Sequence, residues 1–288
     1  MKTVILGASG QLGNCIRKVS SDKSIEGIVF PPEQTSNILD EAALDLLLST
    51  EKPAYVVNCA AYTAVDKAED EQEICRKVNR DGAANIARAC QKHGATLIHI
   101  STDFVFKGDV ARPLTETDPA EPENIYGLTK LEGEEEVAAL LPAHFIIRTS
   151  WLYSEFGNNF VKTMLRLGRE RDELGVIVDQ VGSPTYAIDL AAAILHIITS
   201  GSMAYGIYHY SNEGVTSWYD FARAIFDISE TQVRVKPLKT SEYVTKAVRP
   251  AFSVMDKTKI KNTLGLDVPY WRDSLITCLE QLSVTAQQ

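Results

Sequence analysis

A tyrosine and a lysine in this sequence have types and a spacing that fit acid–base chemistry. Tyr126 lies four residues before Lys130 in the stretch NIYGLTKLEGEEE, which predicts the first turns of a charged helix. Side chains at positions i and i+4 share one helix face, so both could reach the same site. An ammonium group favours a neighbouring phenolate and lowers the phenol's pKa, which is about 10 when unperturbed. The pair predicts a general acid or base, although a tyrosine at a helix start often only packs.

A hydroxyl and a carboxyl group follow a predicted buried strand. Thr102 and Asp103 stand in the stretch HISTDFVF, where the strand reaches the carboxyl edge of its sheet. Ligands of open α/β folds bind at that edge. A hydroxyl such as that of Thr102 can hydrogen-bond the phenol or a substrate oxygen. Together with Tyr126, it would suit a carbonyl/alcohol couple beside a hydride carrier.

A glycine-rich turn precedes these residues near the N-terminus. GASGQLG supplies Gly7, Gly10 and Gly13 between a predicted strand and a predicted helix. Such glycines allow positive φ and let the backbone approach a pyrophosphate at the helix N-terminus. The spacing of three and three differs from G-x-G-x-x-G, and a tight strand-to-helix turn without a ligand would look similar. We interpret the turn as a dinucleotide site.

The choice between NADH and NADPH stays open. An acidic residue after the second strand would hold the ribose 2′-hydroxyl of NAD, whereas a cation would suit the 2′-phosphate of NADP. The chain has Phe30, Pro31, Pro32 and then Glu33 at that point, so neither signal is clear.

Short apolar, β-branched segments alternate with helical patterns through the first 150 residues. The predicted strands are TVILGA, GIVF, AYVVNCA, TLIHIST and HFIIRTS, and the predicted helices span 11–19, 41–48, 79–91 and 128–141. This alternation predicts an α/β fold with a Rossmann-like, doubly wound parallel sheet. We expect residues 1–150 to form the NAD(P)-binding domain, with 174–200 returning to it. Residues 151–288 would mainly form a smaller, interleaved substrate-binding lobe, with helices at 159–171, 187–198 and 217–226.

Composition excludes several classes of protein. The 288 residues carry a formal charge of −9 with no cluster of Lys and Arg, which argues against nucleic-acid binding. No run of 18 apolar residues exists, and MKTVILGASG predicts a strand rather than a signal peptide. The five scattered cysteines, without a C-x-x-C pair, indicate free thiols in a reducing compartment. We therefore expect a cytoplasmic protein.

The chain also resembles a known family in stretches spread from residue 7 to residue 256. These are GASGQLG, VVNCAAYTAVDKAE, VNRDGAANIARAC, HISTDFVFKG, NIYGLTKLEGE, IIRTSWLY, GNNFVKTMLRL, VIVDQVGSPT and RPAFSVMD. They are similar to the extended short-chain dehydrogenase/reductases, and among these to the dTDP-4-dehydrorhamnose reductase family. The resemblance implies NAD(P)H-dependent reduction of the 4-keto group of a dTDP-linked deoxysugar, for rhamnose-containing polysaccharide.

The resemblance implies a role for several residues. Tyr126 would be the proton donor, and Lys130 its electrostatic partner and a ribose contact. Cofactor contacts would come from Gly10, Gln11 and Leu12 at the phosphates, Ala61, Tyr62 and Thr63 at the ribose and nicotinamide, and Asn37 and Ile38 at the adenine end. Substrate contacts would come from Thr102, Asp103, Tyr126, Trp151 against the deoxysugar, and Arg249 at the diphosphate. Alternatively, Trp151 and Tyr62 only pack, Asp103 caps a turn and Arg249 forms a surface salt bridge.

The sequence departs from the family at one metal site. Some members dimerise around magnesium held by glutamates, and the corresponding positions here are Cys15 and Ile188. Neither offers the hard oxygen ligand that magnesium needs, so we predict no metal and a monomer or a metal-independent homodimer. Two other functions stay open: another nucleotide-sugar epimerase or dehydratase, and a non-catalytic NAD(P)-binding regulatory subunit.

Overall fold

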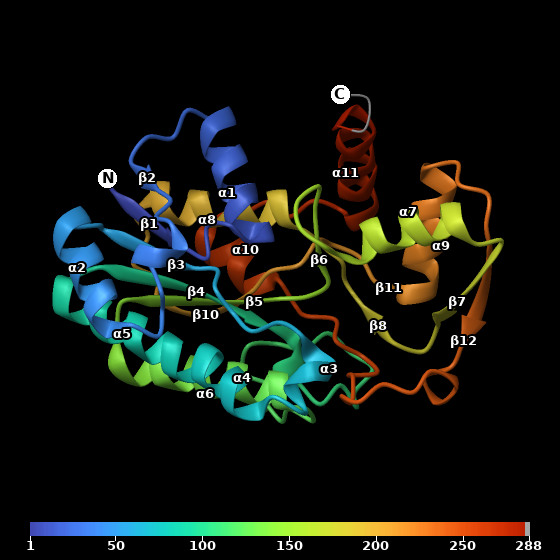
Figure 1. The fold of residues 1–288 in the computed structure, drawn as a ribbon, viewed down its shortest axis with the longest axis horizontal. Helices are drawn as coiled ribbons and strands as arrows, with labels where there is room; N and C mark the ends of the chain where they lie inside the picture. Colours follow the sequence, from blue (N-terminus) through green and yellow to red (C-terminus); the bar gives the residue numbers. More distant parts are fainter. Residues whose placement is uncertain (286–288) are drawn as a thin grey trace.

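A parallel sheet forms the centre of the computed structural model, which describes residues 1–285 (Figure 1). Its strand order is β10-β5-β4-β3-β1-β2. The strands are β1 (Thr3–Leu6), β2 (Ile28–Val29), β3 (Tyr55–Asn58), β4 (Thr96–Thr102), β5 (His144–Thr149) and β10 (Gly206–His209). All neighbours in this sheet pair in parallel, which confirms the predicted fold class. The strand order reverses between β1 and β3, and such a reversal opens a crevice at the carboxyl edge.

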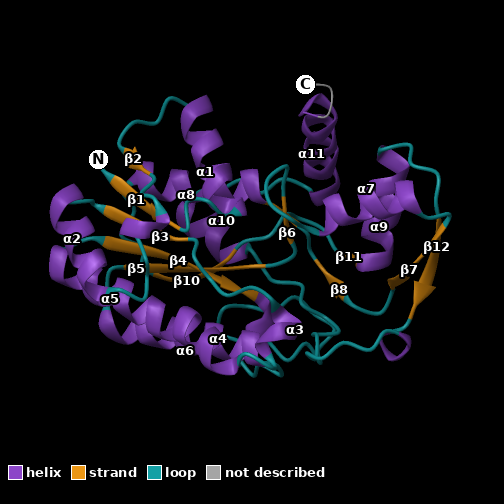
Figure 2. Ribbon diagram, in the orientation of Figure 1, coloured by secondary structure: helices purple, strands orange, loops and turns teal. Residues whose placement is uncertain are grey.

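Helices cover both faces of this sheet (Figure 2). One face packs against α1 (Gln11–Asp22) and α8 (Ala187–Ser200), which contact each other. The opposite face packs against α2 (Glu41–Glu51), α5 (Gly82–His93) and α6 (Ile125–Leu140). Alternate residues of β1 enter the two cores: Ile5 faces α1, whereas Val4 and Leu6 face α2 and α5. Burial on both faces explains why the strands are continuously apolar in sequence.

A smaller unit lies beyond the carboxyl edge of the sheet (Figure 1). It contains α7 (Phe160–Glu170), α9 (Trp218–Ile228) and α11 (Trp271–Thr285), around a core that includes Phe221 and Trp271. Its strands β7 (Glu173–Ile177) and β12 (Arg234–Leu238) pair in parallel. The shorter elements are β6 (Leu152–Tyr153), β8 (Val181–Gly182), β9 (Thr185–Tyr186), β11 (Thr216–Ser217) and α10 (Thr258–Leu264).

The helices that precede α5 differ from the prediction. A helix was expected from residue 79 to 91, but α5 begins at Gly82 and ends at His93. Before it lie α3 (Val65–Ala68), α4 (Gln72–Arg76) and a π-helical segment, Lys77–Asp81. The wider π turn leaves the buried Asn79 side chain inside a hydrogen-bond network with neighbouring elements. π-helical turns often mark functional regions.

Helix starts follow their capping residues. The Asp40 carboxylate accepts a 3.0 Å hydrogen bond from the Ala43 amide, which makes Asp40 the N-cap of α2. Asn124 caps α6 by accepting a 2.7 Å hydrogen bond from the Gly127 amide, which places Tyr126 in the first turn. Within residues 1–285 we find no helix with the length and hydropathy needed to span a membrane.

Candidate active site

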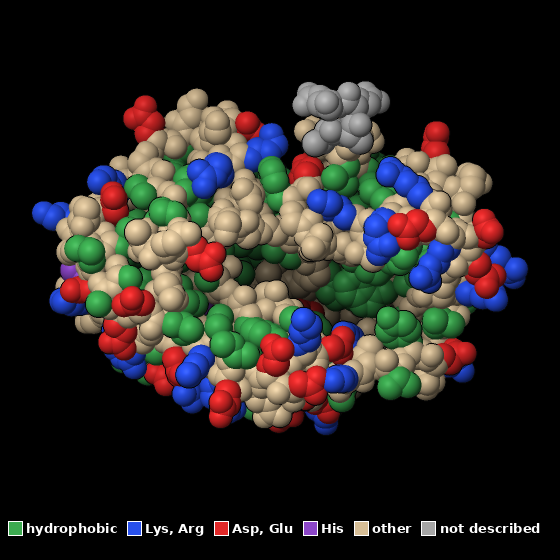
Figure 3. Space-filling model, in the orientation of Figure 1, with side chains coloured by type: hydrophobic (Ala, Val, Ile, Leu, Met, Phe, Trp, Pro, Cys, Tyr) green, Lys and Arg blue, Asp and Glu red, His purple; other side chains and the backbone are tan. Residues whose placement is uncertain are grey.

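A cavity of about 730 Å³ separates the carboxyl edge of the central sheet from the smaller unit. Figure 3 shows a hollow on this face with hydrophobic side chains inside and charged side chains around its rim. Residues from both parts of the chain line the cavity, including Asp66, Asp103, Phe104, Trp151, Trp218 and Arg249. Its size and its largely apolar lining with a few polar groups are typical of small-molecule sites.

Tyr126 is held at the edge of the sheet by tight packing of α6. A Cβ atom on Gly127 would come within 2.1 Å of the Phe104 carbonyl oxygen, so only glycine lets the helix approach this closely. The ring of Tyr126 meets Phe104 edge-on, with centroids 5.6 Å apart. Phe104 belongs to the 3₁₀ turn Asp103–Val105, which follows β4 directly. The phenol is therefore fixed beside the end of β4.

Thr102 and Asp103 lie next to the phenol, as the sequence suggested. The Thr102 hydroxyl is 3.1 Å from Asp103 Oδ1, accepts a hydrogen bond from the Phe104 amide, and also hydrogen-bonds Tyr126. Asp103 is only 2% exposed. Its Oδ2 has no hydrogen bond of ordinary geometry among the described residues, although the side chain of Ser253 also stabilises the carboxylate. Burial raises the pKa of Asp103 to about 6. An unpartnered buried oxygen that lines a cavity is available to a polar ligand.

One expectation about Tyr126 is wrong for the cofactor-free protein. Lys130 was expected to lower the pKa of the phenol, but burial, with a smaller contribution from the charge of Asp103, raises it to about 12. Only the hydrogen bond with Thr102 acts in the opposite direction. Lys130 does not compensate because its ammonium group is directed elsewhere. Tyr126 therefore keeps its proton.

Lys130 is almost completely buried. Its Nζ donates a 2.6 Å hydrogen bond to the Ile100 carbonyl oxygen and lies 3.4 Å from Nε2 of His99. Burial lowers the pKa of Lys130 to about 8, whereas the charge of Glu134 acts in the opposite direction. His99 lies within β4, and nothing in the sequence marked it as a partner of the lysine.

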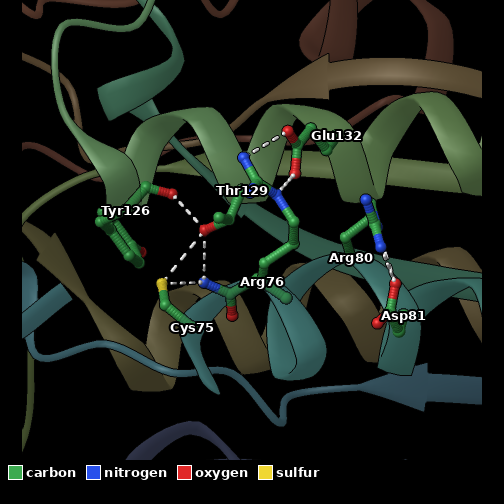
Figure 4. A network of polar contacts seen from close by, with 8 residues as sticks. Cys75, Arg76, Arg80, Asp81, Tyr126, Thr129 and Glu132 are labelled. Carbon is green, nitrogen blue, oxygen red and sulfur yellow. Dashed lines mark hydrogen bonds and ion pairs between the residues drawn. The ribbon is translucent and has the colours of Figure 1, made fainter. Parts of the chain in front are cut away.

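A buried polar network ties α6 to the π-helical segment (Figure 4). The Asn79 side-chain amide donates to Thr129 Oγ1 at 3.1 Å, and Thr129 in turn bonds the Tyr126 carbonyl oxygen. Cys75 Sγ lies 3.2 Å from the same Thr129 hydroxyl. Asn79 also pairs with both backbone groups of Tyr62. The network thus joins the helix of Tyr126 to the loop after β3. Cys75 was expected to be a free thiol, but its hydrogen bonds with Thr129 and Asn79 were not predicted.

The glycine-rich turn has the geometry that its sequence suggested. Gly7 has φ +72°, and a Cβ atom there would lie 2.6 Å from the Ala60 amide nitrogen. A Cβ atom on Gly13 would lie 2.6 Å from two carbonyl oxygens of the same turn. Gly10 is the N-cap of α1, which has neither a side-chain cap nor an acidic residue in its first turn. These free N–H groups and the positive end of the helix dipole fit a pyrophosphate.

The other predicted cofactor residues surround this turn. Gln11 and Leu12 open α1, and the Gln11 side chain bonds the Leu152 carbonyl oxygen. Ala61, Tyr62 and Thr63 follow β3, and the Tyr62 hydroxyl donates to Glu71 at 2.6 Å. Asn37 is exposed before α2 and accepts a hydrogen bond from the Leu39 amide, whereas Ile38 is buried. The contacts of Ile38 are with protein: its side chain meets Gly82 at the start of α5.

Trp151 forms part of the cavity wall with a second tryptophan that the sequence analysis did not single out. The rings of Trp151 and Trp218 stack with centroids 3.5 Å apart and planes 9° from parallel. A Cβ atom on Gly182 would lie 2.7 Å from the Trp151 ring, so the glycine makes room for it. Trp151 has φ +47°, a strained value for a bulky residue. Strain of this kind persists where the surroundings fix a side chain, often in ligand sites.

Arg249 is paired with an acidic residue at the cavity. Its guanidinium donates to both oxygens of Asp66, at 3.1 and 2.7 Å, and both residues line the cavity. The salt-bridge alternative is therefore what the cofactor-free structure contains. Of the two positions that correspond to magnesium ligands in some family members, Cys15 is fully buried and Ile188 packs between two cores. Residues 1–285 contain no group of three or more His, Cys, Asp or Glu side chains that could hold a metal.

Comparisons with known proteins show the family to which the chain belongs. The family model described as the RmlD substrate binding domain matches residues 1–284. The dTDP-4-dehydrorhamnose reductase of Aggregatibacter actinomycetemcomitans is 39% identical over 284 residues, covering 95% of this chain and 97% of that protein. The chain belongs to the dTDP-4-dehydrorhamnose reductase family.

Two solved structures of this family have the same fold. The reductase from Clostridium acetobutylicum matches with a TM-score of 0.94 at 42% identity, covering 98% of this chain and all of that one. The reductase from Bacillus anthracis, solved in complex with NADP, matches with a TM-score of 0.93 at 39% identity over 98% of this chain and 100% of that one. The dTDP-4-dehydrorhamnose reductase family therefore includes a close structural relative that binds the cofactor expected from the glycine-rich turn.

Proposed function

We infer that this protein reduces the 4-keto group of dTDP-4-dehydro-L-rhamnose to form dTDP-L-rhamnose, in a reaction that uses NADPH or NADH. The observation that supports this most strongly is the protonated phenol of Tyr126, which lies beside Thr102 and packs against Phe104, a residue that lines the cavity. The family supplies the substrate class. The reaction would take place in the cytoplasm and feed the synthesis of rhamnose-containing polysaccharide.

In this proposal, residues 1–150 bind the cofactor and residues 151–288 mainly bind the sugar nucleotide. Gly7, Gly10 and Gly13 let α1 approach the pyrophosphate. Gln11 and Leu12 contribute their amides there, while Ala61, Tyr62 and Thr63 line the ribose and nicotinamide side. Asn37 and Ile38 lie at the adenine end. The cofactor, when bound, supplies a hydride to the substrate carbonyl carbon.

Tyr126 supplies the proton that completes the reduction. Its hydroxyl O–H bond breaks as an O–H bond forms on the sugar oxygen. Lys130 would stabilise the charge left on the phenolate when its ammonium group turns from the Ile100 carbonyl oxygen toward Tyr126. Thr102 orients the phenol, and Asp103 offers its unpartnered Oδ2 to a sugar hydroxyl. Trp151 supplies an apolar surface for the 6-methyl group of the sugar.

Arg249 would serve the diphosphate. Its guanidinium lines the cavity and is held by Asp66, so the cation is already oriented before any substrate enters. An anionic ligand would have to share this cation with Asp66 or displace the carboxylate.

The test is the stoichiometry of NADPH oxidation with dTDP-4-dehydro-L-rhamnose. One NADPH should disappear for each sugar reduced, and the UDP- and GDP-linked analogues should react more slowly. An epimerase or dehydratase would convert the sugar with no net consumption, and a regulatory subunit would do neither. NADH should support turnover within about tenfold of NADPH in kcat/KM, because no decisive charge follows β2. A preference above about a thousandfold for either cofactor would show that a charged group does distinguish the two at the ribose 2′-position.

A further inference from the structure

A buried polar chain leads from β3 to the lysine of the proposed site. Asn58 ends β3 and His99 lies in β4, and the two are directly paired in the ladder between these strands. Asn58 Nδ2 is 3.1 Å from His99 Nδ1, and His99 Nε2 is 3.4 Å from Lys130 Nζ. All three side chains are at most 2% exposed. Water cannot rearrange the hydrogen bonds here, so the donors and acceptors must match.

The backbone fixes the orientation of Asn58. The amide of Ala60 donates to Asn58 Oδ1 at 3.0 Å, and a backbone N–H can only donate. The Asn58 Nδ2 group, also only a donor, must therefore face His99. It follows that Nδ1 of His99 is the acceptor, so that the neutral ring carries its proton on Nε2.

A charged imidazole is disfavoured at this position. Both nitrogens would then donate, and Nδ1–H would oppose the Asn58 amide. Burial lowers the pKa of His99 well below its usual value, and the charges of Lys130 and His144 lower it further. His99 is therefore a neutral ring that directs Nε2–H toward Lys130.

The lysine can meet this donor in only one of its forms. An ammonium group has donors alone and offers nothing to Nε2–H, whereas a neutral amine has a lone pair. The Ile100 carbonyl oxygen accepts from Nζ in either form. We propose that Asn58 fixes the tautomer of His99, and that His99 thereby stabilises the neutral amine of Lys130 over its ammonium form in the cofactor-free enzyme. His99 is then a positioning residue that acts through Lys130, and its effect on turnover rests on the proposed function.

The other groups that face Lys130 do not reverse this effect. Glu134, one turn further along α6, favours the ammonium form, but its carboxylate is already paired with Arg148 at 2.6 Å. Cys75 and Cys59 would favour the ammonium form only as thiolates, and burial raises the pKa of both thiols. Burial of Lys130 lowers its pKa and so favours the neutral amine, as the contact with His99 does.

The tautomer can be measured without any turnover. ¹⁵N-histidine-labelled, cofactor-free protein should show His99 with Nδ1 unprotonated and Nε2 protonated between about pH 6 and 9. The resonance can be assigned from its contacts with the Asn58 side-chain amide protons. A proton on Nδ1, or a ring that becomes charged in this range, would overturn the proposal.

A variant of Asn58 reverses the direction of its hydrogen bond with His99 Nδ1. Asn58→Asp keeps an oxygen for the Ala60 amide but replaces the donor that faces Nδ1 with an acceptor. His99 should then carry its proton on Nδ1 and accept from Lys130. An unchanged tautomer in this variant would show that Asn58 does not control the ring.

Turnover provides the second readout. If the ammonium form is required, kcat/KM falls as the pH rises through the pKa of Lys130. His99→Leu removes the Nε2–H donor, so this alkaline limb should move up by about one pH unit, or tenfold in the protonation equilibrium. A limb that stays in place while kcat falls would mean that His99 only packs. If wild-type enzyme oxidises no NADPH, the proposed function fails, but the tautomer is still decided by the spectra.

Discussion

Tyr126 keeps its proton because of where its hydroxyl lies. Burial and the nearby Asp103 disfavour the phenolate, and the hydrogen bond with Thr102 only partly offsets them. A protonated phenol suits a reductase, which must deliver a proton to the sugar oxygen. The sequence predicted the residue types and their proximity at the end of β4. It could not predict the direction of Lys130, which depends on His99 and on the Ile100 carbonyl oxygen.

The raised pKa of Asp103 predicts a pH-dependent stability. Its pKa in the folded protein is about 6, above its usual value of 3.8, so this group stabilises the fold below about pH 4 and that contribution is lost as the pH rises through 6. Asp103→Asn should remove this dependence and raise the free energy of unfolding at pH 8 by up to about 3 kcal/mol. Urea unfolding of both proteins at pH 5 and pH 8 measures it. If the free energies of unfolding of wild type and Asp103→Asn differ by the same amount at both pH values, the pKa of Asp103 is not raised in the folded protein.

Helices and strands were predicted where their local signals are strong. An aspartate at position 40 is a typical N-cap and begins α2, and continuous apolar runs marked the central strands. The π-helical segment was missed because its cause is not local: Asn79 is held by Thr129 of α6 and by the loop after β3. The pairing of β7 with β12 also joins segments far apart in the sequence.

Because α6 packs closely against the turn after β4, a methyl group added at Gly127 should change both stability and activity. Gly127→Ala would place Cβ against the Phe104 carbonyl oxygen, so α6 or the turn must shift. We expect a loss of about 1–3 kcal/mol in the free energy of unfolding, as for other overpacked sites, and a lower kcat because Tyr126 moves with the helix. Glu135→Ala, at an exposed position of the same helix, is the control and should change neither quantity. Thermal unfolding and steady-state kinetics of both variants test these two expectations. If Gly127→Ala keeps the wild-type kcat, the position of α6 does not determine the activity of Tyr126.

At the scale of the whole molecule, the cavity depends on contacts between distant parts of the chain. Asp66 in α3 forms an ion pair with Arg249 in the loop after β12, and Lys246 of the same loop pairs with Asp70. The family resemblance could suggest Arg249 as a phosphate-binding cation, but only the fold shows that Asp66 accompanies it. The stacked pair of Trp151 and Trp218 is a second contact of this kind.

Cys15 and Ile188 predict how the protein responds to chelators. Cys15 is fully buried and Ile188 is apolar, so neither can hold magnesium in place of a carboxylate. Activity should survive EDTA, and added Mg²⁺ should leave the molar mass in solution unchanged. Light scattering and turnover before and after chelation check both. A dimer that dissociates in EDTA and re-forms with Mg²⁺ would contradict this expectation.

The role of Tyr126 as the proton donor is tested most directly by Tyr126→Phe, which removes only the hydroxyl and keeps the ring against Phe104. The measurement is kcat for NADPH oxidation with dTDP-4-dehydro-L-rhamnose, alongside NADPH binding by nicotinamide fluorescence. Binding and folding should be nearly unchanged, while kcat should fall by roughly 10²- to 10⁴-fold, the usual contribution of a positioned general acid. If the variant keeps more than about half of the wild-type kcat while hydride transfer limits the rate, the phenol is structural and this mechanism is wrong.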